Sequence, residues 1–79
     1  MAQISLDGIR KIEKTRNSLH EKVQTTYTVF EVDGKKYVQF DTYGKYNRDN
    51  PEKISQSLQF DEETARFIVK LLISEFEMI

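Results

Sequence analysis

Hydrophobic and polar residues alternate on both sides of the dipeptide Asp33-Gly34, and this is the clearest local pattern in the chain. Asp-Gly tolerates the positive φ values that a type I′ turn needs, so the pattern predicts a two-residue β-hairpin. Its register places Val32 opposite Lys35 and Tyr27 opposite Phe40. Alternation then separates an apolar face from a polar face that also carries aromatic rings. The apolar face has Val23, Tyr27, Val29, Val38 and Phe40, and the other has Thr26, Thr28, Phe30, Tyr37, Gln39, Asp41 and Tyr43.

Two further strands are expected outside the hairpin. The segment 54–60 alternates between apolar and polar residues, which predicts a strand. The N-terminal segment 4–16 mixes isoleucines with charged residues and fits no clean period. We expect a strand there, with a bulge or turn at Asp7-Gly8. The segment 44–53 is dense in turn-forming residues and predicts a loop.

The C-terminal segment has the features of an amphipathic helix. Asp61 stands where a helix cap is expected, and acidic residues follow in the first turn, where the helix dipole favours them. A helix over 62–77 would be roughly 24 Å long, enough to cross a four-stranded sheet. Its apolar residues cover more than half of its circumference, more than one small sheet would bury. We therefore expect a homodimer, with closer wrapping by the N-terminal strand as the alternative. The interface residues would be Ile68, Leu72, Phe76 and Ile79.

These elements together predict an α+β fold: a four-stranded twisted antiparallel sheet followed by one C-terminal helix. The 79 residues are too few for two independently folding units, so one domain spans 1–79. The longest apolar runs are three residues, and the N-terminus lacks a basic segment followed by an apolar one, so neither a membrane span nor a secretory signal is expected. The chain has no cysteine, which fits a cytoplasmic location.

The charges are segregated along the chain, although the net charge is only −1. Residues 1–60 contain ten Lys and Arg against eight Asp and Glu, whereas residues 61–79 contain two against five. Such a bipolar surface could hold a polyanion on one side, and the alternative is simply solvated strand edges. The two basic clusters are Arg10, Lys11, Lys14 and Arg16 near the N-terminus, and Lys35, Lys36, Lys45, Arg48 and Lys53 in the middle.

The sequence offers little for catalysis. His20 is the only histidine, so no histidine-rich metal site and no Ser-His-Asp arrangement is indicated. The three glycines are too scattered for a phosphate-binding loop. We expect a protein that is not an enzyme and uses neither metal nor cofactor.

The polar face of the hairpin and the 44–53 loop instead suggest a binding surface. Single-stranded nucleic acid is bound where bases stack on aromatic rings and where Lys and Arg follow the phosphates. Aromatic residues are also common in strands for structural reasons alone, because they pair across strands. The predicted binding residues are Phe30, Lys35, Lys36, Tyr37, Gln39, Tyr43, Lys45, Arg48 and Lys53.

One stretch resembles a known family. The segment 36–43, the loop to Lys53 and the segment 54–63 that leads into the helix are similar to the single-stranded-DNA-binding domain of the transcriptional positive cofactor four family and its small bacterial relatives. The likeness covers about half the chain. It implies a twisted four-stranded sheet, dimerisation partly through the helix, and binding of unpaired strands across sheet and loops. The Lys-Gly pair typical of the last strand is Lys53-Ile54 here, and the chain lacks the tryptophan common near the loop. The residues implied for binding are Tyr37, Gln39, Tyr43, Lys45, Arg48 and Lys53.

Two classes of function follow from these observations. The first is binding of single-stranded nucleic acid, DNA before RNA, by an accessory of transcription or replication. The second is a small protein-interaction module, such as a phage or mobile-element inhibitor or a regulatory subunit. The acidic helix, with Glu62, Glu63, Glu75 and Glu77, would then meet a basic partner.

Overall fold

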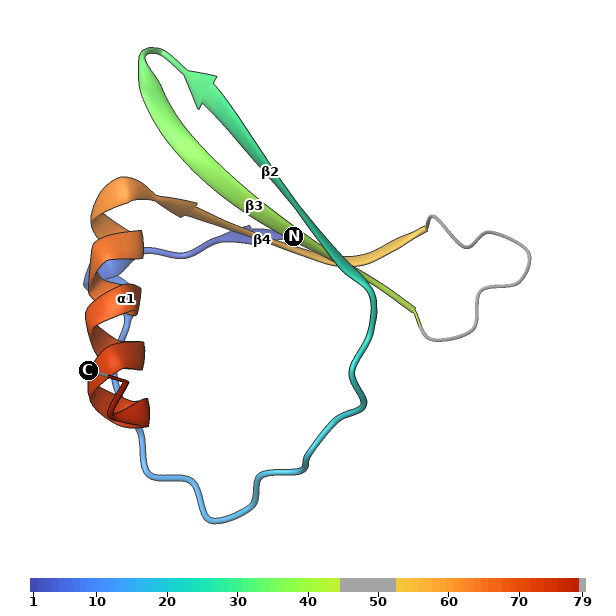
Figure 1. Ribbon diagram of the computed structural model, residues 1–79, viewed down its shortest axis with the longest axis vertical. Coiled ribbons are helices and arrows are strands. Elements are labelled where there is room, and N and C mark those ends of the chain that lie inside the picture. The colour runs from blue at the N-terminus through green and yellow to red at the C-terminus, as the bar shows by residue number, and fades with distance from the viewer. Residues whose placement is uncertain (45–52, 79) are drawn as a thin grey trace.

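The chain folds into one four-stranded sheet followed by one helix (Figure 1). The computed structural model describes residues 1–44 and 53–78. Within them the strand order is β1-β4-β3-β2. The predicted α+β fold with a C-terminal helix is confirmed. The elements are β1 (Ala2–Gln3), a 3₁₀ turn η1 (Leu6–Gly8), β2 (Thr25–Val32), β3 (Lys35–Tyr43), β4 (Ile54–Asp61) and α1 (Glu62–Phe76).

Strands β2 and β3 form the predicted hairpin. Asp33 and Gly34 have φ values of 52° and 77°, the left-handed conformation that a two-residue turn requires. The register pairs Val32 with Lys35 and runs on through Tyr27 opposite Phe40, as predicted. The local turn chemistry therefore determines which residues of the hairpin share a face.

Strand β4 pairs antiparallel with β3, with Phe60 opposite Val38 and Leu58 opposite Phe40. A register irregularity lies between Thr42 and Tyr43. Because of this irregularity, the regular alternation of β4 does not extend to its first residue, Ile54, which pairs with Tyr43. The predicted strand is confirmed, and its regular part runs up to the helix cap.

The first strand differs from the prediction. It comprises only Ala2–Gln3, and the chain from residue 9 to residue 24 forms no strand. Strand β1 runs parallel to β4, with Ala2 paired to Leu58, so the sheet is mixed and the expectation of a fully antiparallel sheet is wrong. The expected turn is present as η1. This pairing joins segments more than fifty residues apart, and no local pattern encodes the direction of such a pair.

Helix α1 begins where the sequence predicts. The Asp61 side chain accepts a hydrogen bond of 2.8 Å from the backbone N–H of Thr64, which is the N-cap interaction. The helix ends at Phe76, one residue earlier than expected, because Glu77 adopts a left-handed conformation with φ 51°. An ion pair of 2.7 Å joins Arg66 to Glu62 one turn away.

The two sides of the sheet are defined by the strand register. The apolar side carries Tyr27, Val29, Val38, Phe40, Leu58 and Phe60. The polar side carries Thr26, Thr28, Phe30, Tyr37, Gln39, Asp41, Tyr43, Ser57 and Gln59.

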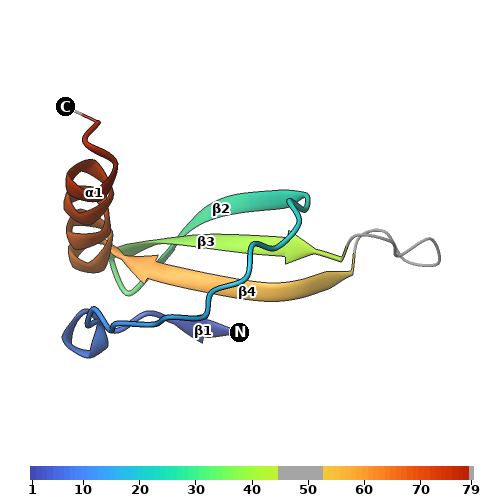
Figure 2. The same cartoon turned by 90° about the horizontal axis from the view of Figure 1, so that it is seen from below.

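Helix α1 and the segment 9–24 both lie on one side of the sheet (Figures 1 and 2). In a hairpin with a two-residue turn, the N–H and C=O groups of Tyr37 and Gln39 point toward β2. Those of Val38 and Phe40, which alternate with them, therefore point toward β4. With β3 running as Figure 2 shows, the chirality of L-residues then places the side chains of Val38 and Phe40 on the side of the helix. The apolar side therefore looks toward α1 and the segment 9–24. None of the described elements covers the polar side.

No apolar side chain of the described residues is fully buried. On the apolar side of the sheet, Tyr27 is 69% exposed and Val29 54% exposed. The sequence predicts a helix that crosses the sheet, but α1 stands at the end of the strands, and its main contacts are with β4 and η1 (Figure 2). The chain thus has an apolar layer that its own helix does not cover.

The helix cap gives a pH-dependent prediction. The hydroxyl and the backbone N–H of Thr64 stabilise the carboxylate of Asp61 and lower its pKa below the ordinary value. A lowered pKa adds stability above the pKa of the unfolded chain, about 4, and this stability is lost as the pH falls through the folded pKa. We expect Asp61→Ala to lower the thermal midpoint at pH 7 by a few degrees and to have a smaller effect at pH 3.

Asp61→Asn is the control, because asparagine also caps helices but does not titrate. This variant should have a thermal midpoint at pH 7 close to that of the wild type, and its midpoint should fall less in acid. Thermal unfolding followed by circular dichroism between about pH 2.5 and 7 measures both effects. An alanine variant with the midpoint of the wild type at pH 7 would show that the cap contributes nothing.

Candidate functional site

The polar side of the sheet brings together most of the residues predicted to bind nucleic acid. Lys36 is one position out of phase and belongs to the opposite side. Lys53 is exposed immediately before β4. Lys45 and Arg48 lie outside the described residues. The predicted residues that share the polar side are Phe30, Lys35, Tyr37, Gln39 and Tyr43.

Aromatic rings stand at both ends of this side. Phe30 and Tyr37 form a cross-strand pair, with ring centroids 5.5 Å apart and planes inclined by 21°. At the other end, the Tyr43 hydroxyl is hydrogen-bonded to the Thr26 hydroxyl at 3.0 Å. All three rings are half-buried, so each serves the packing of the sheet and still presents part of its surface to solvent.

A hydrogen-bonded network joins β3 to β4 between these rings. The Ser57 hydroxyl and the Gln39 amide nitrogen, the latter at 2.9 Å, both donate to Oδ1 of Asp41. The Gln59 amide nitrogen donates to Oε1 of Gln39 at 2.7 Å. Asp41 is 7% exposed and Ser57 5%, so these donors compensate the burial of a carboxylate.

The network also fixes how the amides are presented. Gln39 accepts a hydrogen bond from Gln59 and donates one to Asp41, so its side-chain amide cannot flip without losing both hydrogen bonds. A hollow beside the network is lined by Gln39, Ser57, Gln59 and residues 1–3 at the β1 edge. The polar side therefore offers pre-oriented amide groups next to a concave edge.

The sequence places Gln39, Asp41, Ser57 and Gln59 on polar strand faces and names Gln39 among the binding residues, but it does not predict the network that joins the four side chains. The available signal is that polar residues alternate in both strands. The missing information is the register of β3 against β4, because the 44–53 segment joins them and no two-residue turn fixes their alignment. Only the paired strands show that Asp41 lies opposite Ser57 and Gln39 opposite Gln59.

The lysines at the hairpin tip have acidic surroundings. Lys35 and Lys36 line one hollow together with four carboxylates. Lys35 also contributes to lowering the pKa of Asp61, after the contacts from Thr64. Two cations among four anions do not make a phosphate site, so Lys35 and Lys36 do not form a positive surface at the hairpin tip. The acidic residues of this hollow are Glu31, Asp61, Glu62 and Glu63.

The predicted dimer residues lie on α1 with different exposure. Ile68 is half-buried, Leu72 is 43% exposed and Phe76 is 71% exposed. Ile79 lies outside the described residues. The described part of this stripe is therefore accessible to a partner.

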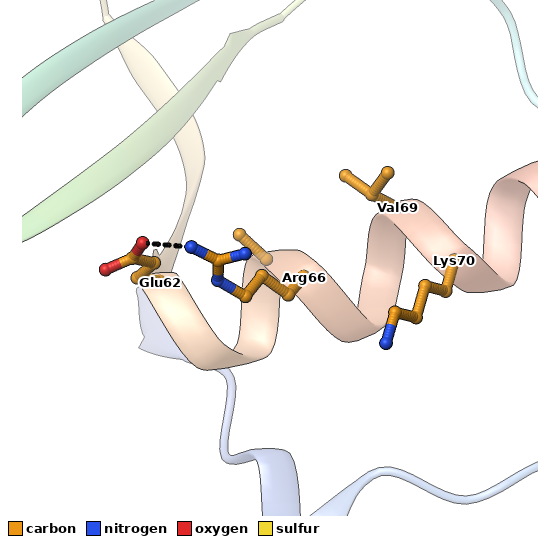
Figure 3. A pocket seen from close by; sticks show the side chains of 5 residues that line it. Glu62, Arg66, Val69 and Lys70 are labelled. Atoms are coloured by element: carbon orange, nitrogen blue, oxygen red, sulfur yellow. Dashed lines mark hydrogen bonds and ion pairs between the residues drawn. The ribbon is translucent and has the colours of Figure 1, made fainter.

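A third hollow follows the flank of α1 (Figure 3). Ala65 and Val69 contribute apolar groups, and Glu62, Arg66 and Lys70 surround them with charge. The Glu62–Arg66 ion pair closes one end of this hollow (Figure 3). It is an open surface feature with no buried polar group directed into it.

Residues 1–44 and 53–78 offer neither a group of metal ligands nor a membrane-spanning helix. This part of the chain contains no group of three or more His, Asp or Glu residues that could hold a metal ion. It also contains no helix that is long and apolar enough to span a membrane.

Comparison with known proteins gives no relative. No family model, curated protein or solved structure matches the chain. The function is therefore inferred from the geometry of the chain itself.

The network yields a prediction on stability. Ser57→Ala removes one of the donors to a buried carboxylate and should lower the free energy of unfolding by about 1.5–3 kcal/mol. Ser55→Ala in the same strand is the matched control, because Ser55 is exposed, and it should change stability by no more than about 0.5 kcal/mol. Urea unfolding followed by circular dichroism measures both. Equal values for the two variants would contradict a stabilising role for the network.

Proposed function

We propose that this protein binds single-stranded nucleic acid on the polar side of its sheet, without catalysis, as an accessory of transcription or replication in the cytoplasm. One observation carries the proposal: an uncovered sheet surface combines aromatic rings from neighbouring strands with hydrogen-bonded amides. Bases stack on such rings irrespective of sequence, each worth about 1–3 kcal/mol. DNA is the first candidate and RNA the second.

The distribution of charge indicates which end of the sheet would hold phosphates. At the hairpin end, carboxylates offset Lys35 and Lys36. At the opposite end of the sheet, β3 leads into the 44–53 segment, whose sequence contains Lys45, Arg48 and Lys53. The Asp41 carboxylate between the two ends already accepts two hydrogen bonds, which reduces its repulsion of phosphate. In this proposal Lys45, Arg48 and Lys53 hold the phosphates of the nucleic acid at the loop end of the sheet. The bases then extend across the aromatic rings of the polar side.

The role of the loop cations can be tested by charge reversal. Fluorescence anisotropy of a labelled mixed-sequence oligonucleotide, single-stranded and duplex, is measured over a range of salt concentrations. We expect preference for the single strand, and we expect Lys45→Glu with Arg48→Glu to weaken binding. Each lost phosphate contact should reduce the slope of log affinity against log salt by about 0.7.

Lys14→Glu with Arg16→Glu is the matched control, because it makes the same change of charge in the other basic cluster. It should reduce affinity less than the loop variant. Equal losses would indicate general attraction to a polyanion. No binding at tens of micromolar protein in low salt would reject the proposal.

The role of the rings can be tested separately. We expect Tyr37→Leu to weaken binding of the single strand by about 1–3 kcal/mol, with little change in salt dependence. Tyr27→Leu removes the same ring from the apolar side while keeping an apolar side chain there, and it should reduce the affinity less than Tyr37→Leu. The chain has no tryptophan, so quenching of its tyrosine emission also reports stacking. Equal affinities for the two variants would contradict binding on the polar side.

A protein-interaction module is the second candidate, favoured by the exposed helix. Glu62, Glu63 and Glu75 are exposed on α1 beside apolar groups. A basic partner would bind there, leaving the polar side of the sheet free. In that case, charge reversal of the helix glutamates would abolish binding of the basic protein partner. The loop variant Lys45→Glu with Arg48→Glu would bind this partner as the wild type does.

A further inference from the structure

The described chain leaves two apolar surfaces without a partner, and both lie on the same side of the molecule. The first is the apolar side of the sheet, where Tyr27, Val29 and Phe40 are 69%, 54% and 39% exposed. The second is α1, on which Leu72 and Phe76 are also exposed. Exposed apolar groups gathered on both a sheet and a helix mark an interaction surface. The other exposed apolar residues of the helix are Phe67, Val69 and Leu71.

The total surface shows how much is missing. A folded monomer of 9.4 kDa exposes about 5,000 Å². This chain exposes 7661 Å². Its radius of gyration is 15.0 Å, whereas a compact chain of this length has a value of about 12 Å. The chain alone thus exposes about 2,700 Å² more than a folded monomer of its size.

We infer that a second copy of this chain covers the apolar side, so that the hydrophobic core forms between two chains. If each copy buries its surplus, the interface removes about 5,400 Å² in total, which is the size of large obligate homodimer interfaces. A weak or transient contact would bury far less. Folding and dimerisation then form one step, because the described residues of one chain form no buried apolar core.

The charges favour a second copy over an unrelated partner. Residues 10–24 are exposed on the apolar side of the sheet and contain five basic and two acidic residues. The C-terminal end of α1, on the same side, carries Glu75 and Glu77. One chain therefore presents an apolar surface with a basic border and an apolar surface with an acidic border. Two copies related by a twofold axis can satisfy both borders at once.

The oligomeric state of the full chain is the first test. Sedimentation equilibrium should give about twice the monomer mass of 9.4 kDa at micromolar concentration. The thermal midpoint should rise with protein concentration, because association stabilises the folded state by mass action. A species of 9.4 kDa with cooperative unfolding that is independent of concentration would overturn the inference. So would a chain that is unfolded alone and folds only with a different protein.

Two pairs of variants locate the interface. Val29→Lys and Leu72→Lys place a charge in the covered surface, and each should raise the dissociation constant of the dimer about tenfold or more. Thr28→Lys and Ser74→Lys are the matched controls, because they add the same charge at exposed positions away from the apolar stripe, and they should leave the constant unchanged. In an isolated chain the half-exposed Val29 would tolerate lysine.

The outcomes of these variants are distinct. Weaker association of the two apolar-side variants alone supports the inference. If those variants fail to fold while the controls fold as dimers, that result also supports it, because folding then depends on the covered surface. A dimer that none of the four changes affects, or that all four weaken equally, would overturn it.

Discussion

The left-handed turn at Asp33-Gly34 is the constraint on which the rest of the sheet depends. Two residues with positive φ leave β2 and β3 only one register, and this register assigns every side chain of the hairpin to a side. A slip of one residue would exchange the two sides. Because β4 pairs with β3, the same assignment extends to the third long strand and determines what faces α1.

The two sides of the sheet meet their physical requirements in different ways. Polar groups need directional partners, and neighbouring strands supply these at short range, as for Asp41 with Ser57 and Gln39. Apolar groups need to be covered by another layer, which strands within one sheet cannot provide. Since α1 leaves the sheet at its end, the polar side is complete within one chain whereas the apolar side is not. The proposed binding surface and the inferred dimer surface are therefore on opposite sides of one sheet.

Part of the candidate site could be predicted from the sequence, and the reason is local. Phe30, Tyr37 and Gln39 fall on one side because the hairpin register follows from the turn. The lysines beside the turn show the limit of this reasoning, since the carboxylates that offset them come from the start of α1 as well as from β2. A cluster of charge along the chain becomes a cluster in space only when no other element brings opposite charge to it.

The hairpin, the helix and its cap follow from the amino-acid sequence alone, because each of these depends on residues no more than a few positions apart. The parallel pairing of β1 with β4, the position of Asp41 opposite Ser57 and the uncovered apolar side appear only in the folded chain. Strand direction and register across long connections have no local code, because many alignments satisfy the same alternation of polar and apolar residues. The position of a helix against a sheet likewise depends on which apolar areas are covered in the assembled molecule, and residue spacing along the chain does not contain that information.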